Sequence, residues 1–163
     1  MTYYFGNYSL YIALLSSIYL ILKTYFLARD SSKTVDNKIF VISSIQTIMI
    51  IISFATLIIA FIISDFSNST VFNNSHTTKP LFYKISGTWG NHEGSLLLWL
   101  LVLSLFLYFF YISSNSQNLR YRLLTVLFQQ LIITGFLLFI LFTSNPFETL
   151  YPIPNEGLGL NPI

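Results

Sequence analysis

The stretch "TWGNHEGSLLLWLLVLSLFLYFFYI", residues Thr88 to Ile112, decides the fold class of this chain. Its second part, from Ser95 onward, is an apolar run without a charge, long enough to cross a lipid bilayer, which takes roughly 20 helical residues. Its first part sets Trp, His, Glu and two glycines immediately before that run. This abrupt change predicts a transmembrane helix with a structured, watery entrance.

The composition of the whole chain is that of a membrane protein. Of its 163 residues, 54% are hydrophobic and only 9% are charged, whereas a soluble domain carries about a quarter charged residues. The chain has no cysteine, which excludes disulfides and thiolate metal sites of its own. The net charge of +2 comes from scattered basic residues, which argues against a nucleic-acid partner. Abundant Ile, Phe, Tyr, Leu, Ser and Asn favour an AT-rich genome, such as that of an organelle.

The sequence predicts an all-α membrane protein with four transmembrane helices, over about residues 8–28, 40–64, 95–112 and 123–142. We expect residues 1–143 to form this four-helix domain and residues 144–163 to form a Pro-rich tail. The fourth stretch contains the polar pair Gln129 and Gln130. In lipid such amides either join neighbouring helices or line a substrate path, and the pattern favours the packing role.

Basic residues in the short connections predict the orientation of the helices. Five lie in the first and third connections and two in the second: Arg29, Lys33, Lys38, Arg120 and Arg122 against Lys79 and Lys84. The more positive side faces the cytoplasm or matrix. Both termini and the loop of residues 65–94 are therefore expected on the periplasmic or intermembrane-space side. This loop shows no helical period, and the function is expected there.

The residues before the third apolar stretch can be explained as a well-built helix entrance. Ser95 is a suitable N-cap, and Glu93 would stabilise the positive end of the helix by roughly 0.3 to 1 kcal/mol. Gly90 and Gly94 permit backbone angles or close approaches that side chains forbid. Trp89 and Trp99 are typical of the aromatic belt at a membrane interface, and Lys84 is typical of a contact with lipid headgroups.

A functional interpretation of the same residues centres on His92. If the helix begins a turn early, His92, Ser95 or Leu96, and Trp99 share one face, where a flat aromatic ligand could lie. The sequence H-E-G-S-L lacks the second His of the zinc motif H-E-x-x-H, so no metal site is expected. His76, the other histidine, is expected to be a solvated residue of the Asn- and Ser-rich loop.

The stretch "TWGNHEGSLLLW", Thr88 to Trp99, resembles the W-G-x-H-E-G-S-x-L-L-W signature of the CcmF-type haem lyases of cytochrome c maturation and their nitrite-reductase-associated relatives. "GFLLFILFTSNPFETL" (135–150) and "PIPNEGLGLNPI" (152–163) resemble the blocks that follow in that family, in the same order. The resemblance covers residues 65–163 well. It covers the first two helices in arrangement and apolar character only.

This resemblance implies an enzyme that joins haem vinyl groups to the two thiols of a C-x-x-C-H sequence in apocytochrome c, on the outer side of the membrane. It also implies a b-type haem, a tryptophan-rich loop and several histidine ligands, all downstream of the matched region. We therefore expect the amino-terminal piece of a split lyase in the mitochondrial inner membrane, with the bacterial inner membrane as the alternative. Its partners would be other lyase pieces carrying the haem ligands, apocytochrome c, further maturation components and membrane lipid.

No residue of this chain is assigned a catalytic role, but seven are expected to face haem or apocytochrome: Trp89, Gly90, His92, Glu93, Gly94, Ser95 and Trp99. His92 would make a polar or proton-handling contact near the haem edge, Glu93 would orient His92 or the helix entrance, and Lys84 would lie near the propionates. Two alternatives stay open. One is a structural membrane subunit of a respiratory or assembly complex that does not contact haem. The other is a small channel or transporter, although the sequence shows no membrane-buried acid or base that would mark a path across the four helices.

Overall fold

The computed structural model of the chain describes residues 2–29, 37–114 and 116–159. This part of the chain is helical, with four long helices and two short ones: α1 (Thr2–Arg29), α2 (Asn37–Ile63), α3 (Ser69–Asn74), α4 (Leu81–Gly87), α5 (His92–Ser113) and α6 (Leu119–Phe142). An isolated antiparallel bridge pairs Asn68 with Thr149.

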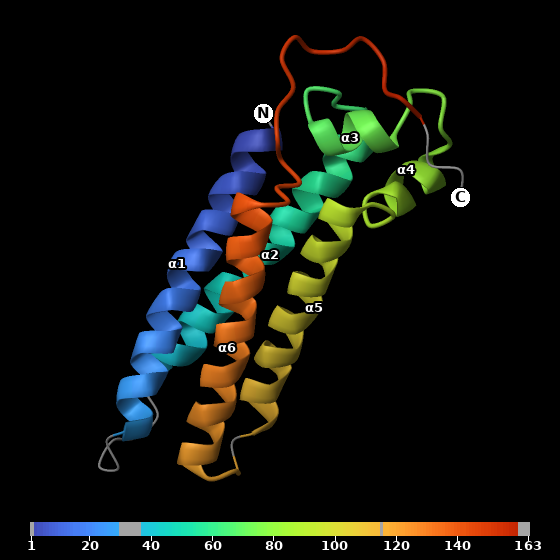
Figure 1. The fold of residues 1–163 in the computed structure, drawn as a ribbon. Coiled ribbons are helices and arrows are strands. Elements are labelled where there is room, and N and C mark those ends of the chain that lie inside the picture. The colour runs from blue at the N-terminus through green and yellow to red at the C-terminus, as the bar shows by residue number, and fades with distance from the viewer. Residues whose placement is uncertain (1, 30–36, 115, 160–163) are drawn as a thin grey trace.

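The four long helices form an antiparallel bundle (Figure 1). Helix α1 packs against α2 and α6, and α5 packs against the same two, so the helices close into a ring in the order α1, α2, α5, α6. Each of the four is long and apolar enough to cross a membrane. The predicted all-α membrane protein with four transmembrane helices is thereby confirmed.

Helical spacing explains which side chains enter the bundle. Helix α1 buries small and aliphatic residues three or four positions apart, namely Leu10, Ala13, Ser17, Leu20 and Thr24. Such positions lie on one face of a helix, and small side chains there let neighbouring helices approach closely in lipid. The intervening Leu15 is 67% exposed and faces outward. In a membrane protein this outward face contacts lipid, which is why it is as apolar as the core.

Thr2, Ile63, His92 and Phe142 mark one end of the bundle, which we call the motif end. Helices α3 and α4 and the segment after α6 lie at the same end (Figure 1). The start of α1 and the tail therefore share one side, as four spanning helices require. The compartment that this side faces stays a prediction.

The basic residues used for that prediction differ in their surroundings. Arg122 is buried, and its guanidinium donates to the Ser114 hydroxyl at 3.0 Å and to the Tyr111 carbonyl at 3.3 Å. This arginine joins α6 to the end of α5 as well as carrying charge. Lys33 lies outside the described residues.

A buried layer of hydrogen-bonded side chains joins α1, α2 and α6. The Gln130 amide donates to the Gln46 oxygen at 2.8 Å, and the Gln46 amide donates back at 3.1 Å. The Ser17 hydroxyl donates to the same Gln130 oxygen at 2.8 Å. Gln129 donates to the Leu103 carbonyl of α5 at 3.0 Å. Both amides of the pair thus connect helices, which confirms the packing role.

The loop of residues 65–94 differs from the prediction, because it contains α3 and α4. The side chain of Asn68 caps α3 by accepting from Val71 N at 3.2 Å, and it donates to the Pro146 carbonyl at 2.9 Å. A six-residue helix is too short to show a period in the sequence. It depends instead on this cap and on the tail contact.

The tail crosses the motif end, arching over α3 in Figure 1. Phe147 is fully buried against Gly6 of α1, where a Cβ would lie 2.2 Å from the Phe147 ring. Further along, Leu158 N donates to the Phe72 carbonyl at 2.8 Å and Gly159 N to the Ser75 carbonyl at 3.1 Å. Residues 144–159 are thus anchored on α1 and on α3, whereas residues 160–163 lie outside the described residues. The domain division at residue 143 stays a prediction.

Candidate functional site

Helix α5 begins at His92, one turn before the predicted start at Ser95. Its N-cap is Asn91, whose side-chain oxygen accepts from Gly94 N at 2.7 Å. The Asn91 amide also donates to the Gly87 carbonyl at 2.8 Å, which links α5 to the end of α4. The expectation that Ser95 is the N-cap is therefore wrong. Ser95 lies in the first turn and donates its hydroxyl to the His92 carbonyl at 2.9 Å.

Gly94 is required by the close approach of two backbone segments. A Cβ at this position would lie 1.6 Å from the Thr88 carbonyl oxygen, a distance that no side chain tolerates. Gly94 is buried, and Thr88 is fully buried beneath it. Gly90, by contrast, is exposed in the turn between them. The motif thus folds back on itself, and Gly94 with Asn91 holds it closed.

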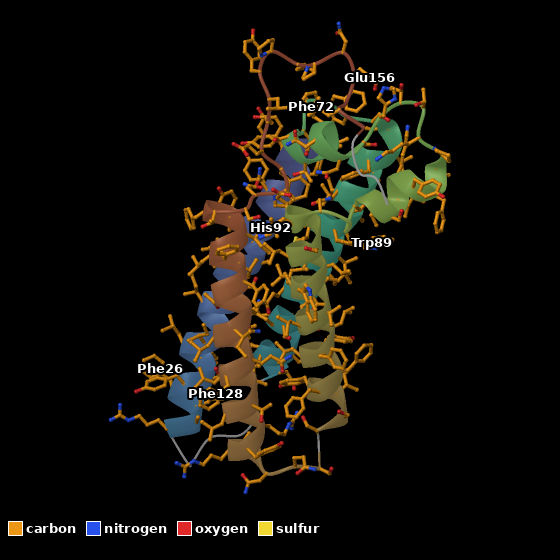
Figure 2. The ribbon with its side chains drawn as sticks, turned by 45° about the vertical axis from the view of Figure 1, so that its right-hand side comes forward. Phe26, Phe72, Trp89, His92, Phe128 and Glu156 are labelled. Carbon is orange, nitrogen blue, oxygen red and sulfur yellow. The ribbon has the colours of Figure 1, made fainter. Side chains whose placement is uncertain are left out.

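His92 stands exposed where this turn meets α6. Its Nδ1 lies 2.9 Å from the Ser144 hydroxyl, just beyond the end of α6, and its ring centroid is 6.4 Å from that of Phe139. Because Ser144 engages Nδ1, Nε2 is the ring nitrogen left for a further partner. Figure 2 shows His92 at the motif end, beside the top of α6.

The remaining predicted residues lie around the turn in different directions. Trp89 and Trp99 are 42% and 61% exposed, and Figure 2 shows Trp89 on the α4 side, apart from His92. Glu93 lies in the first turn of α5, where the helix dipole stabilises a carboxylate. The Lys84 ammonium donates to the Ser64 hydroxyl at 2.7 Å, which holds it at the end of α2.

The early start of α5 places motif residues and residues of the apolar run on one helix face. His92, Leu96 and Trp99 are spaced four and three residues apart, so they line the same side of α5. Leu96 also lines an apolar groove of about 400 Å³ together with Ile132, Gly135, Phe136 and Phe139 of α6. Phe139 belongs to this groove and contacts the His92 ring, so the groove leads up to His92.

Two carboxyl groups at the motif end have lowered pKa values. Burial acts to raise the pKa of Asp65, but hydrogen bonds from Ser67 and Thr2 outweigh it and bring the pKa below its ordinary value. Glu156 accepts from the Thr77 hydroxyl at 2.7 Å and from Thr77 N at 3.0 Å, and these bonds lower its pKa. His76 Nε2 lies 3.8 Å from the same carboxylate. His76 thus belongs to the contact between the loop and the tail.

Sequence reasoning missed Asn91, Ser144 and Phe139 as parts of this site. Ser144 and Phe139 are distant in sequence and meet His92 only because α5 and α6 are antiparallel neighbours. One signal in the sequence could have found them. Because consecutive spanning helices run in opposite directions, the start of the third apolar stretch and the end of the fourth lie on the same side of the membrane. Among the described residues, no group of three His, Cys, Asp or Glu side chains could hold a metal ion.

The sequence and the structure of this chain are both similar to those of known proteins. The cytochrome c-type biogenesis protein CycK of Rhizobium meliloti is 48% identical over 118 residues, which cover 71% of this chain and 17% of CycK. The corresponding protein NrfE of Haemophilus influenzae is 37% identical over 160 residues, which cover 97% of this chain and 25% of NrfE. A solved structure, Cytochrome c Heme Lyase CcmF, superposes with a TM-score of 0.80 at 25% identity, covering 93% of this chain and 26% of that one.

This chain corresponds to the amino-terminal portion of the CcmF-type cytochrome c biogenesis proteins. It spans a quarter or less of the length of the CcmF-type relatives CycK and NrfE, 17% and 25% respectively. No family model matches it. The predicted resemblance is confirmed, and it extends further than expected, because the NrfE alignment also covers α1 and α2.

Proposed function

We propose that this chain is the amino-terminal part of a haem lyase that attaches haem to apocytochrome c, acting with partner chains that carry the haem-ligand histidines. The observation that carries the proposal is that different residues of the motif have structural and exposed positions. Asn91 and Gly94 hold the turn closed, and His92 is left exposed beside it. The similarity to CycK, NrfE and the CcmF lyase supports the reaction class.

Haem is the substrate in this proposal and, in its b-type form, a cofactor of the assembled complex. The donor set of the motif fits at most one axial ligand, His92 Nε2, since Nδ1 is bonded to Ser144. His76 packs against Glu156 and Thr78 instead. The described residues therefore do not form a two-histidine haem site, and we assign the ligands of the membrane haem to the partner chains.

The chemistry to be served is the addition of a cysteine thiol across a haem vinyl group, which forms a thioether and moves one proton. His92 is suited to a polar or proton-handling contact, because an imidazole can donate or accept a hydrogen bond and this ring is exposed. Glu93 lies in the first turn of α5, where it supports the entrance. Trp89 and Trp99 offer exposed indoles to haem or apocytochrome. Gly90 is exposed and Ser95 is half-buried beside them.

Lys84 is the propionate-side residue of the proposal. Its ammonium donates to the Ser64 hydroxyl, so a propionate would share or displace a bond that already exists. An ammonium has three donors, which permits sharing. Lys84 therefore fits a propionate without rearrangement of α2.

We place the protein in the mitochondrial inner membrane, with the bacterial inner membrane as the alternative, and orient the motif end toward the intermembrane space or periplasm. The composition supports the mitochondrial assignment and the distribution of basic residues supports the orientation. Apocytochrome c, further maturation components and membrane lipid complete the proposed partners.

A structural membrane subunit without contact to haem is the second candidate. Its supporting observation is that Gly94 and Asn91 are already occupied in holding α4 and α5 together. Under this function the motif persists for packing alone. The two candidates differ in what they require of His92, whose ring is exposed and holds no helix in place except through Ser144.

The test purifies a tagged chain gently from its native membranes. Partner proteins are identified by mass spectrometry, and the haem absorption spectrum of the same sample is recorded for the native chain and for His92→Ala. The lyase proposal expects partners with a tryptophan-rich loop and membrane histidines together with haem, and reduced cytochrome c maturation in His92→Ala. Respiratory subunits without haem, and unchanged maturation in His92→Ala, would instead support the structural subunit.

A further inference from the structure

The groove between α5 and α6 lies within the membrane-spanning part of the bundle. It is lined by Leu96 and, over two turns of α6, by Ile132, Gly135, Phe136 and Phe139. Ile132 and Phe139 are 52% and 44% exposed, so the groove opens away from the bundle. Its lining is apolar throughout, which fits a hydrocarbon surface and excludes a path for ions.

Gly135 has a different setting from the glycines at the motif end. Gly6, Gly94 and Gly157 each lie so close to another segment that a Cβ would clash at 2.2, 1.6 and 2.1 Å respectively. A Cβ on Gly135 would meet no atom within 4 Å. Glycine in a helix interior is less favourable than alanine, and no contact within the described chain requires it at this position. A second helix that approaches the backbone closely would require it.

We infer that a transmembrane helix of a partner chain, one that carries the remaining part of the lyase, docks in the α5–α6 groove at Gly135. This inference rests on the proposed function. The occupant follows from length, because the matched relatives are about four to six times as long as the aligned segment, which covers 17% of CycK and 25% of NrfE. Acyl chains adapt to any surface and need no glycine, whereas helix pairs in membranes use small residues to bring their backbones together.

The position of the groove gives this docking a consequence for the motif. Phe139 lines the groove and contacts the His92 ring, whose Nδ1 is held by Ser144. A helix that fills the groove therefore ends beside His92 at the motif end. The partner's outer segment would then face the exposed side of the imidazole, and the site would be completed between the two chains.

The absence of cysteine from this chain makes the test specific, since a single introduced thiol is unique. Ile132→Cys lies in the groove, and Leu15→Cys, at a site 67% exposed on α1, is the matched lipid-facing control. Each variant is labelled in native membranes with a thiol-reactive photo-crosslinker and irradiated, and the adducts are identified by mass spectrometry. We expect Ile132→Cys to give an adduct with the partner chain and Leu15→Cys to define the lipid background.

Two outcomes overturn the inference and can be told apart. If Ile132→Cys reacts only with lipid while the partner chain still co-purifies, the docking site is wrong and the proposed function stands. If no partner with lyase features co-purifies, both fall.

Filling the groove gives a second, independent measurement. Gly135→Leu should lower recovery of the partner chain about tenfold at unchanged levels of the tagged chain, and Gly135→Ala should lower it about two- to threefold. Leu138→Phe, at a position 43% exposed outside the groove, should leave recovery unchanged. Equal recovery with Gly135→Leu and the native chain would refute docking at this glycine.

Discussion

The imidazole of His92 lies 2.9 Å from the hydroxyl of Ser144, and this contact joins the first residue of α5 to the segment that follows α6. Ser144 is buried, whereas His92 is exposed. A buried hydroxyl on one ring nitrogen fixes the orientation of the imidazole and the direction in which its other nitrogen points. The contact therefore ties the motif to the start of the tail.

The first prediction concerns Ser144 as a positioning residue. Ser144→Ala should lower the covalent attachment of haem to cytochrome c several-fold, because His92 loses its fixed orientation. The chain should still fold, since one such hydrogen bond contributes about 0.5–1.5 kcal/mol. The measurement is haem-stained cytochrome c per amount of tagged chain. Ser144→Thr keeps the hydroxyl and should restore attachment, whereas equal attachment in the Ala variant would remove the positioning role.

The second prediction concerns the closed turn of the motif. Gly94→Ala should lower the thermal unfolding midpoint of the detergent-purified chain, because its Cβ would lie 1.6 Å from the Thr88 carbonyl oxygen. Overpacking typically costs about 1–3 kcal/mol, and neither backbone segment can rotate away as a side chain would. Gly135→Ala is the matched control, since no atom lies within 4 Å of the added Cβ. Equal losses in both variants would contradict a close approach at Gly94.

The four spanning helices could be predicted because lipid requires apolar residues on every face of a membrane helix, which leaves long runs visible in the sequence. Their ends were less predictable. Thr2 and Asn37 begin helices several residues before the apolar runs, since polar residues at a membrane interface continue a helix at little cost. The short helices α3 and α4 depend on caps and on tertiary contacts, which no local period records.

The motif was visible in the sequence, but its internal roles were not. Ser95 borders the apolar run and is a good N-cap by type, yet His92, Glu93 and Gly94 form a helical turn of their own and Asn91 caps it. The role of Ser144 depends on α6 ending beside His92, which is a property of the packed bundle. Residue type made both Asn91 and Ser95 suitable N-caps, and only the folded structure shows that Asn91 has this role.

The third prediction concerns the buried amide layer. Gln130→Leu removes both hydrogen bonds that the Gln46 amide group shares with Gln130, and it removes one of the partners of the Ser17 hydroxyl. We expect a loss of roughly 1–3 kcal/mol, the usual cost of a buried unsatisfied polar group, measured as the stability of the purified chain. The double variant Gln46→Leu with Gln130→Leu should recover part of that loss, because both amides are gone. Additive losses would mean that the two side chains do not act as a pair.

The fourth prediction concerns pH and Asp65. Burial acts to raise the pKa of this carboxyl, but hydrogen bonds from Ser67 and Thr2 prevail and bring it below the ordinary value of 3.8. A lowered folded-state pKa means that the carboxylate stabilises the fold in full above the unfolded-state value. That contribution is lost as the pH falls below 3.8 and through the folded-state pKa.

The measurement is the unfolding midpoint of the native chain and of Asp65→Asn across the acid range. The native chain should be the more stable above pH 3.8, and the difference should shrink as the pH falls below that value. Thr2→Val removes one donor to the carboxylate, so it should raise the pKa of Asp65 toward 3.8 and make the acid-induced loss of stability smaller. Because Asp65 ties the start of α1 to the end of α2, this acid-labile contact belongs to the motif end. A constant difference between the two chains at every pH would mean that the carboxylate contributes through packing, and that its hydrogen bonds from Thr2 and Ser67 do not favour the ionised form.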